Sequence, residues 1–150
     1  GLYRGRTVIL TPLAENSVQS VDLVRRAWQA CGASVIDMDA GSHDRLLASV
    51  SHLPHLLSAV YMEQVATAAD ARTRLDLAGS GFRDFTRIAA GSPEMWRDIF
   101  LSNRDAMLAE LADVRAVLDR AERAIADGDD AALLALLETA AEARRNWRKE

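Results

Sequence analysis

The sequence is short of cysteine and of long apolar runs, and each shortage excludes a class of structure. Its single cysteine, Cys31, excludes an intramolecular disulfide and any metal site built from a cysteine cluster. No apolar run approaches the roughly 20 residues that a membrane-spanning helix needs. The basic residues of segment 1–6 are not followed by the apolar core of a signal peptide. We therefore expect a cytoplasmic protein with no bound metal and no membrane partner.

Aromatic residues and positive charge are scarce as well. Aromatic side chains make up 5% of the chain, and 22 acidic residues outnumber 18 basic ones, which gives a formal net charge of −4. Nucleic-acid binding usually needs a basic face and aromatic stacking platforms, so we expect no nucleic-acid partner. Apolar residues, in contrast, make up 49% of the 150 residues. This fraction is too high for a disordered tail and is sufficient for a folded core.

The first segment has the pattern of a strand, a helix and a second strand. Residues 7–10 form a short apolar run that ends at Thr11-Pro12, and residues 34–38 form another. Between them a helix is predicted from a cap at Asn16 or Ser17 to Gly32, a typical helix stop. Two short strands and one helix make a poor core alone. We interpret them as the edge of a larger sheet.

The remainder of the chain has the pattern of helices. Apolar residues recur at helical spacing from about residue 41 to 71, with a kink or break expected at Pro54. A loop is predicted over 78–81 and a short helix over 82–89. Ser92 and Pro93 then begin a helix predicted to continue unbroken to residue 127, followed by a last helix capped by Asp129 and including Trp147.

The long predicted helix carries a nearly heptad apolar stripe. Such a stripe is typical of a helix-packing or dimer interface, and more typical of that than of a cofactor site. The residues of this stripe are Phe100, Met107, Leu111, Val114, Leu118, Ala121 and Ile125.

The first candidate functional cluster surrounds Pro54. Ser51 and His55 are four residues apart and share a helix face, and His52 lies between them. One interpretation is a ligand-binding crevice at a proline-disrupted helix, and the other is a set of polar residues closing a kinked core helix. A zinc site has little support because no third ligand stands at a recognisable spacing.

The second candidate cluster follows the predicted loop. Gly81 precedes a helix start that favours anions. Arg87 is three positions after Asp84, so Arg87 either pairs with Asp84 or holds a substrate carboxylate. A third cluster, 92–100, includes Trp96, which we interpret as core packing.

Five stretches in this order resemble the prephenate dehydrogenase family. They read VILTP (8–12), HD (43–44), SHLPH (51–55), GFRDFTRIA (81–89) and WRDIF (96–100). In that family an N-terminal Rossmann domain binds the nicotinamide cofactor, and a helical C-terminal domain dimerises and completes the substrate site. The resemblance implies a mainly α fold: a helical dimerisation and substrate-binding domain over 40–150, preceded at 1–39 by the terminal strand–helix–strand of a nucleotide-binding domain.

The resemblance also implies an activity and a site. The family oxidises prephenate, with loss of its ring carboxylate, to 4-hydroxyphenylpyruvate in tyrosine biosynthesis, using NAD or NADP, and some members use arogenate instead. A homodimer through the C-terminal helices is implied. Arg87 would bind a substrate carboxylate, and the other residues lining or adjoining the pocket would be Ser51, His52, His55, Gly81 and Asp84.

No catalytic residue is expected in this chain. The family histidine that polarises the substrate hydroxyl, and the glycine fingerprint that binds the cofactor, would both lie before Gly1. The 150 residues alone are therefore expected to be inactive. The alternative from a different functional class is a non-catalytic helical dimerisation module on the same scaffold.

Overall fold

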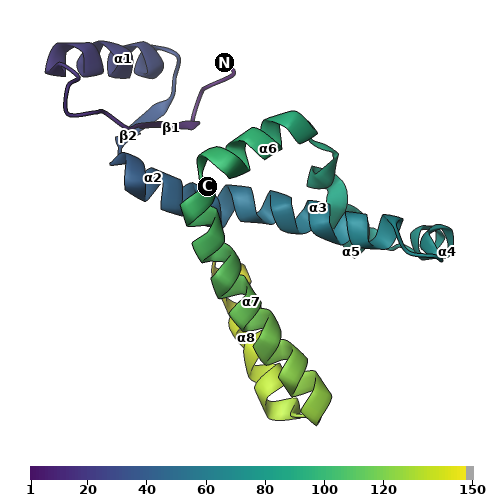
Figure 1. The fold of residues 1–150 in the computed structure, drawn as a ribbon. Helices are drawn as coiled ribbons and strands as arrows, with labels where there is room; N and C mark the ends of the chain where they lie inside the picture. Colours follow the sequence, from purple (N-terminus) through teal and green to yellow (C-terminus); the bar gives the residue numbers. More distant parts are fainter. Residues whose placement is uncertain (148–150) are drawn as a thin grey trace. The chain divides into compact units, whose positions relative to one another are not determined.

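The computed structural model describes residues 1–147. It contains two compact units, Gly1–Met107 and a second that begins at Leu108 (Figure 1). Most of the described chain is helical, as predicted. Within residues 1–147, no helix is long and apolar enough to cross a membrane. The domain boundary placed between residues 39 and 40 stays a prediction.

The first unit begins with the predicted strand–helix–strand. β1 (Thr7–Leu10) and β2 (Ser34–Asp37) are parallel, and α1 (Val18–Ala30) connects them. The hydroxyl of Ser17 accepts a hydrogen bond from the backbone amide of Ser20 and so caps α1. Gly32, with a φ of 86°, turns the chain out of the helix into β2. In the described residues the sheet has only these two strands, as expected for one edge of a larger sheet.

A π-helical turn precedes Pro54, the residue at which a kink or break is predicted. α2 (Ala40–Leu47) passes into the π-helix η1 (Ala48–His52) and then into α3 (Leu53–Ala66) without a break. The amide of Leu53 bonds to the carbonyl of Ala48, five residues back. Pro54 has no amide proton, and it lies in the first turn of α3, where none is required.

The apolar and polar side chains of α3 are not separated onto two faces, and its buried residues are Leu53, Ser58 and Val65. It ends at Ala66, earlier than predicted, and is followed by α4 (Ala71–Asp76). α5 (Ser80–Thr86) and the 3-10 helix η2 (Arg87–Ala90) pack against it.

The contact between α3 and α5 is partly polar and partly aromatic. The fully buried hydroxyl of Ser58 donates to the carbonyl of Phe85 at 2.9 Å, and the ring of Tyr61 contacts Phe82 and Phe85.

The predicted loop over 78–81 is too long, because Ser80 and Gly81 belong to α5.

The prediction of one unbroken helix from residue 93 to 127 is wrong. α6 (Pro93–Ser102) and α7 (Arg104–Asp127) are separate helices, and Asn103, with φ −109° and ψ 36°, stands between them. The side chain of Asn103 bonds to groups of α2 and η1, so a distant contact accompanies the break. Phe100 therefore lies on a different helix from the rest of the predicted heptad stripe.

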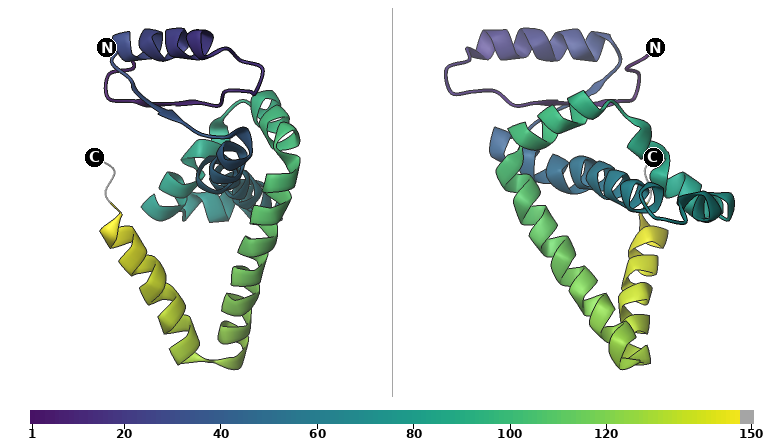
Figure 2. Two further views of the ribbon diagram at one scale, coloured as in Figure 1. Left: turned by 90° about the vertical axis from the view of Figure 1, so that its left-hand side faces the viewer. Right: turned by 45° about the vertical axis from the view of Figure 1, so that its right-hand side comes forward.

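The second unit is a helical hairpin. α7 ends before Gly128, which has a φ of 64°, and Asp129 caps α8 (Asp130–Asn146) as predicted. Trp147 follows the last helical residue instead of lying within the helix. Both views of Figure 2 show the two helices diverging from their turn. Many large apolar side chains consequently remain exposed: Leu108, Val117, Leu118, Ile125, Leu134 and Leu137.

Candidate functional site

A pocket of about 430 Å³ lies in the first unit among α3, η2 and α6. This volume is in the range of small-molecule sites. Its wall is mostly apolar, and two basic side chains, His55 and Arg97, join it. The apolar part consists of Ala59, Ile88, Ala89, Gly91, Pro93, Trp96, Phe100 and Leu101.

His55 and Trp96 form one side of this pocket. Their rings are stacked, with centroids 3.7 Å apart and planes inclined by 22°. Nδ1 of His55 donates to the backbone carbonyl of Ser51 at 2.9 Å, a bond along the helix that fixes the ring orientation. The Nε2 atom of a neutral His55 is then an acceptor. His55 thus presents both a flat face and a hydrogen-bonding atom.

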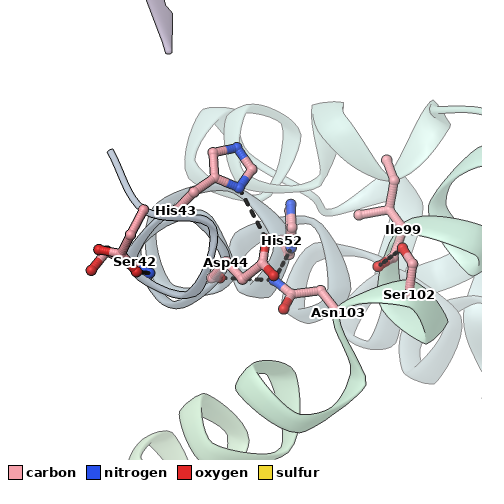
Figure 3. A network of polar contacts seen from close by, with 8 residues as sticks. Ser42, His43, Asp44, His52, Ile99, Ser102 and Asn103 are labelled. Carbon is pink, nitrogen blue, oxygen red and sulfur yellow. Dashed lines mark hydrogen bonds and ion pairs between the residues drawn. The ribbon is translucent and has the colours of Figure 1, made fainter. Parts of the chain in front are cut away.

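His52 also lies near Trp96. Its ring stands edge-on to Trp96, with centroids 6.4 Å apart. The amide nitrogen of Asn103 lies 3.2 Å from Nδ1 of His52 and 2.8 Å from the carbonyl oxygen of Asp44 (Figure 3). Burial, and next the nearby charge of His43, lower the pKa of His52 below the usual 6.5, so His52 is neutral at pH 7.

α2 holds the Asp44 carbonyl in place for this contact. Asp39 caps α2 by accepting a hydrogen bond from the amide of Ser42 at 2.8 Å. Hydrogen bonds from the side chain and the backbone of Ser42 lower the pKa of Asp39. The carboxylate of Asp44 lies 3.0 Å from Nδ1 of His43 (Figure 3). The carboxylate and the carbonyl of Asp44 therefore contact different partners.

The structure brings the predicted residues of the first cluster together. Ser51 contributes its carbonyl, and both histidines lie against Trp96. Among the described residues, no hydrogen bond or ion pair connects this cluster with Gly81, Asp84 or Arg87.

Gly81, Asp84 and Arg87 are exposed on α5 and η2. Within residues 1–147 the ion pair of Asp84 is with Arg83, at 3.8 Å, and not with Arg87. Arg87 directly precedes Ile88 and Ala89, which line the pocket.

Sequence reasoning missed two residues of this region. The sequence pattern favours core packing for Trp96, but the side chain is only partly buried and forms a wall of the pocket. The apolar pattern places Asn103 inside a helix, although asparagine favours helix ends over helix interiors. This preference was the one local signal for the break.

Among residues 1–147, no three His, Cys, Asp or Glu side chains gather closely enough to hold a metal ion.

Comparison with known proteins gives consistent matches. Residues 39–139 match the family described as "Prephenate dehydrogenase, dimerization domain". A cyclohexadienyl dehydrogenase from Zymomonas mobilis is 37% identical over 134 residues, covering 85% of this chain and 45% of that protein. A prephenate dehydrogenase from Bacillus subtilis is 30% identical over 144 residues, covering 95% of this chain and 39% of that protein.

Solved structures match over nearly the whole chain. The crystal structure of prephenate dehydrogenase from A. aeolicus, in complex with hydroxyphenyl propionate and NAD+, has a TM-score of 0.89 and 32% identity, covering 96% of this chain and 51% of that one. Arogenate dehydrogenase from Synechocystis has a TM-score of 0.85 and 27% identity, covering 98% of this chain and 54% of that one. This chain thus spans about half the length of the relatives it matches, and it belongs to the prephenate dehydrogenase family.

Proposed function

We propose that this chain is the C-terminal helical part of an enzyme that oxidatively decarboxylates prephenate to 4-hydroxyphenylpyruvate in tyrosine biosynthesis. The observation that carries the proposal is the pocket beside the His55–Trp96 stack, within the segment that matches the family. Prephenate has a six-membered carbocycle and two carboxylates. An apolar wall suits the ring, and hydrogen-bond donors and cations suit the carboxylates.

The proposed substrate contacts come from three elements. Ser51, His52 and His55 supply polar groups from η1 and α3, and Arg87 on η2 receives a carboxylate. The position of Arg87 supports this role, because the two residues after it line the pocket and its guanidinium is not paired with Asp84. Gly81 and Asp84 are proposed to adjoin the substrate from α5.

A nicotinamide cofactor is proposed for the whole enzyme, since the A. aeolicus relative was solved with NAD+. Residues 1–39, the proposed end of a nucleotide-binding domain, do not fit a nicotinamide dinucleotide by themselves. The connection from β1 to α1, residues 11–17, contains no glycine, so its backbone lacks the close approach that a dinucleotide pyrophosphate requires. The cofactor, NAD or NADP, would accept the hydride, and residues outside this chain would bind most of it. Such an enzyme would work in the cytoplasm.

We further propose that two copies associate through α7 and α8. The exposed apolar side chains of the diverging hairpin support this assembly, because apolar patches of this kind are normally covered in folded proteins. The matched family region, described as a dimerization domain, includes most of both helices.

The test is oxidation of prephenate and of arogenate, each with NAD+ and with NADP+, by a protein that carries this chain behind a complete nicotinamide-binding domain. We expect reduced cofactor to form with prephenate. The 150-residue chain alone is expected to give no turnover and no micromolar cofactor binding in calorimetry. Absence of turnover with either substrate in the complete protein would support the non-catalytic dimerisation module instead.

A further inference from the structure

The amide of Asn103 lies between two acceptors, and this position fixes its orientation. The carbonyl oxygen of Asp44 can only accept, so the group 2.8 Å from it must be the amide nitrogen of Asn103. The reverse orientation would place two oxygens against each other. The same nitrogen has a second proton, and Nδ1 of His52 lies 3.2 Å away (Figure 3).

Nδ1 of His52 therefore accepts a hydrogen bond. In a neutral imidazole only one ring nitrogen carries a proton, so that proton is on Nε2. We propose that Asn103 is a positioning residue that holds neutral His52 in the tautomer with its proton on Nε2. Asn103 is nearly buried, with 9% of its surface exposed, so water competes little for its amide.

His55 has the opposite tautomer. Its Nδ1 donates to the carbonyl of Ser51, so in the neutral ring Nε2 is the acceptor. Two histidines three residues apart, both beside Trp96, thus present a donor at one Nε2 and an acceptor at the other. His55 lines the pocket, and His52 stands edge-on to its Trp96 wall. A ligand that reaches both rings would offer an acceptor, such as a carboxylate or carbonyl oxygen, to His52 and a donor to His55.

The charges around His52 also matter, because a protonated imidazole could not accept from Asn103. Burial and the charges of His43 on α2 and His55 on α3 disfavour the protonated ring, whereas Asp44 on α2 favours it. The neighbours from α6 and the α6–α7 junction, Trp96 and Asn103, are uncharged. The balance lowers the pKa of His52 and keeps Nδ1 available as an acceptor.

The direct test is nitrogen-15 NMR of the histidine side chains in this 150-residue chain above pH 7. Two-bond proton–nitrogen spectra distinguish a protonated ring nitrogen from an unprotonated one. We expect the proton of His52 on Nε2 and that of His55 on Nδ1. Finding the His52 proton on Nδ1, or an even mixture of tautomers, would overturn the proposal without any variant.

Asn103→Asp provides the complementary variant. A carboxylate at this position accepts instead of donating, so the His52 proton should move to Nδ1 and the pKa of His52 should rise. The His55 signals in the same spectrum serve as the internal control and should not change. The hydroxyl of Ser102 donates to the carbonyl of Ile99, so Ser102→Ala should leave both tautomers as they are. An unchanged His52 tautomer in Asn103→Asp, with His55 native-like, would also count against the proposal.

The role of Asn103 in orienting His52 for the substrate rests on the proposed function and is tested separately. In a complete enzyme, Asn103→Asp should raise KM for prephenate about tenfold, with a smaller change in kcat, because a substrate acceptor loses its donor. If the tautomer reverses but KM stays constant, His52 is not positioned for the substrate. Failure of the unaltered complete enzyme to oxidise prephenate would refute the proposed function and leave the NMR result standing.

Discussion

Gly91 lies so close to Trp96 that a methyl group on Gly91 would stand 2.6 Å from Nε1 of the indole and 3.0 Å from its Cδ1. The φ of Gly91 is −66°, a value open to every residue. Glycine is therefore required here for space and not for backbone conformation. The absence of a side chain at residue 91 allows the indole to occupy its position against His55.

Gly91→Ala should displace the Trp96 ring from its stack on His55. We expect a shift in Trp96 fluorescence, measured with Trp28 and Trp147 replaced by phenylalanine, and weaker substrate binding in a complete enzyme. Gly79→Ala is the matched control, because a Cβ there would meet no atom within 4 Å. Identical spectra for Gly91→Ala and its parent would show that the wall adapts freely.

Stability should depend on the protonation of His52. Its pKa is lower in the folded chain than the usual 6.5, so the unfolded chain binds more protons between these two values. The part of the free energy of unfolding that depends on neutral His52 is fully present above pH 6.5. It is lost as the pH falls through 6.5 toward the pKa of His52 in the folded chain. Urea unfolding at pH 7.5, 6.5 and 5.5 should show this loss.

His52→Gln removes the titrating group and should reduce the pH dependence over the same interval. Ser49→Ala, an exposed change in the same π-helical turn, should retain the parent's dependence. A steeper loss of stability in His52→Gln than in the parent would contradict the assigned direction of the pKa shift.

Arg87→Ala tests the proposed carboxylate receptor. The lost charge-assisted contact, worth roughly 1.5–3 kcal/mol, should raise KM for prephenate on the order of 10- to 150-fold, with a smaller fall in kcat. Arg87→Lys should recover part of the loss, because an ammonium cannot reproduce the two-pronged contact. Steady-state kinetics of a complete enzyme, with thermal melting alongside, measure both effects.

The control for Arg87 is Arg72→Ala, which breaks an exposed pair with Asp76 on α4 and should change neither KM nor the melting temperature appreciably. An unchanged KM with a lowered melting temperature in Arg87→Ala would mean that Arg87 has a structural role only.

Leu118→Glu and Ile125→Glu should dissociate the proposed dimer. Both side chains are more than half exposed in the single chain, so the substitutions cost little in the monomer and place charge in an apolar interface. Light scattering at high micromolar concentration should give twice 16.4 kDa for the parent and 16.4 kDa for the variants. Val18→Glu, exposed on α1, should remain dimeric. A monomeric parent would refute the assembly.

Elements defined by neighbouring residues were predictable from the sequence. The Ser17 and Asp129 caps and the Gly32 stop act within one helical turn, and the structure contains all three. The family resemblance also indicated the histidine cluster. The break at Asn103 was not predictable in this way, because the carbonyl of Asp44 that it binds lies 59 residues earlier.

The same limit applies to Trp96. An aromatic residue at helical spacing has one sequence pattern whether it fills a core or lines a pocket. Only the placement of α3 against α6 distinguishes the two outcomes, and that placement depends on many side chains that are distant in sequence.

The π-helical turn at residues 48–52 sets the rotational phase between α2 and α3. An α-helix advances about 100° per residue, and a π turn accommodates one residue more than a regular α turn would. The side chains after His52 are therefore turned about the helix axis, relative to those of α2, by the rotation of that one extra residue. If a chain one residue shorter within 48–52 continued as a regular α-helix, α2 would turn about 100° relative to α3 and carry the Asp44 carbonyl away from Asn103. The local winding of this turn, and not the length of the helix, therefore sets which face of α2 meets Asn103.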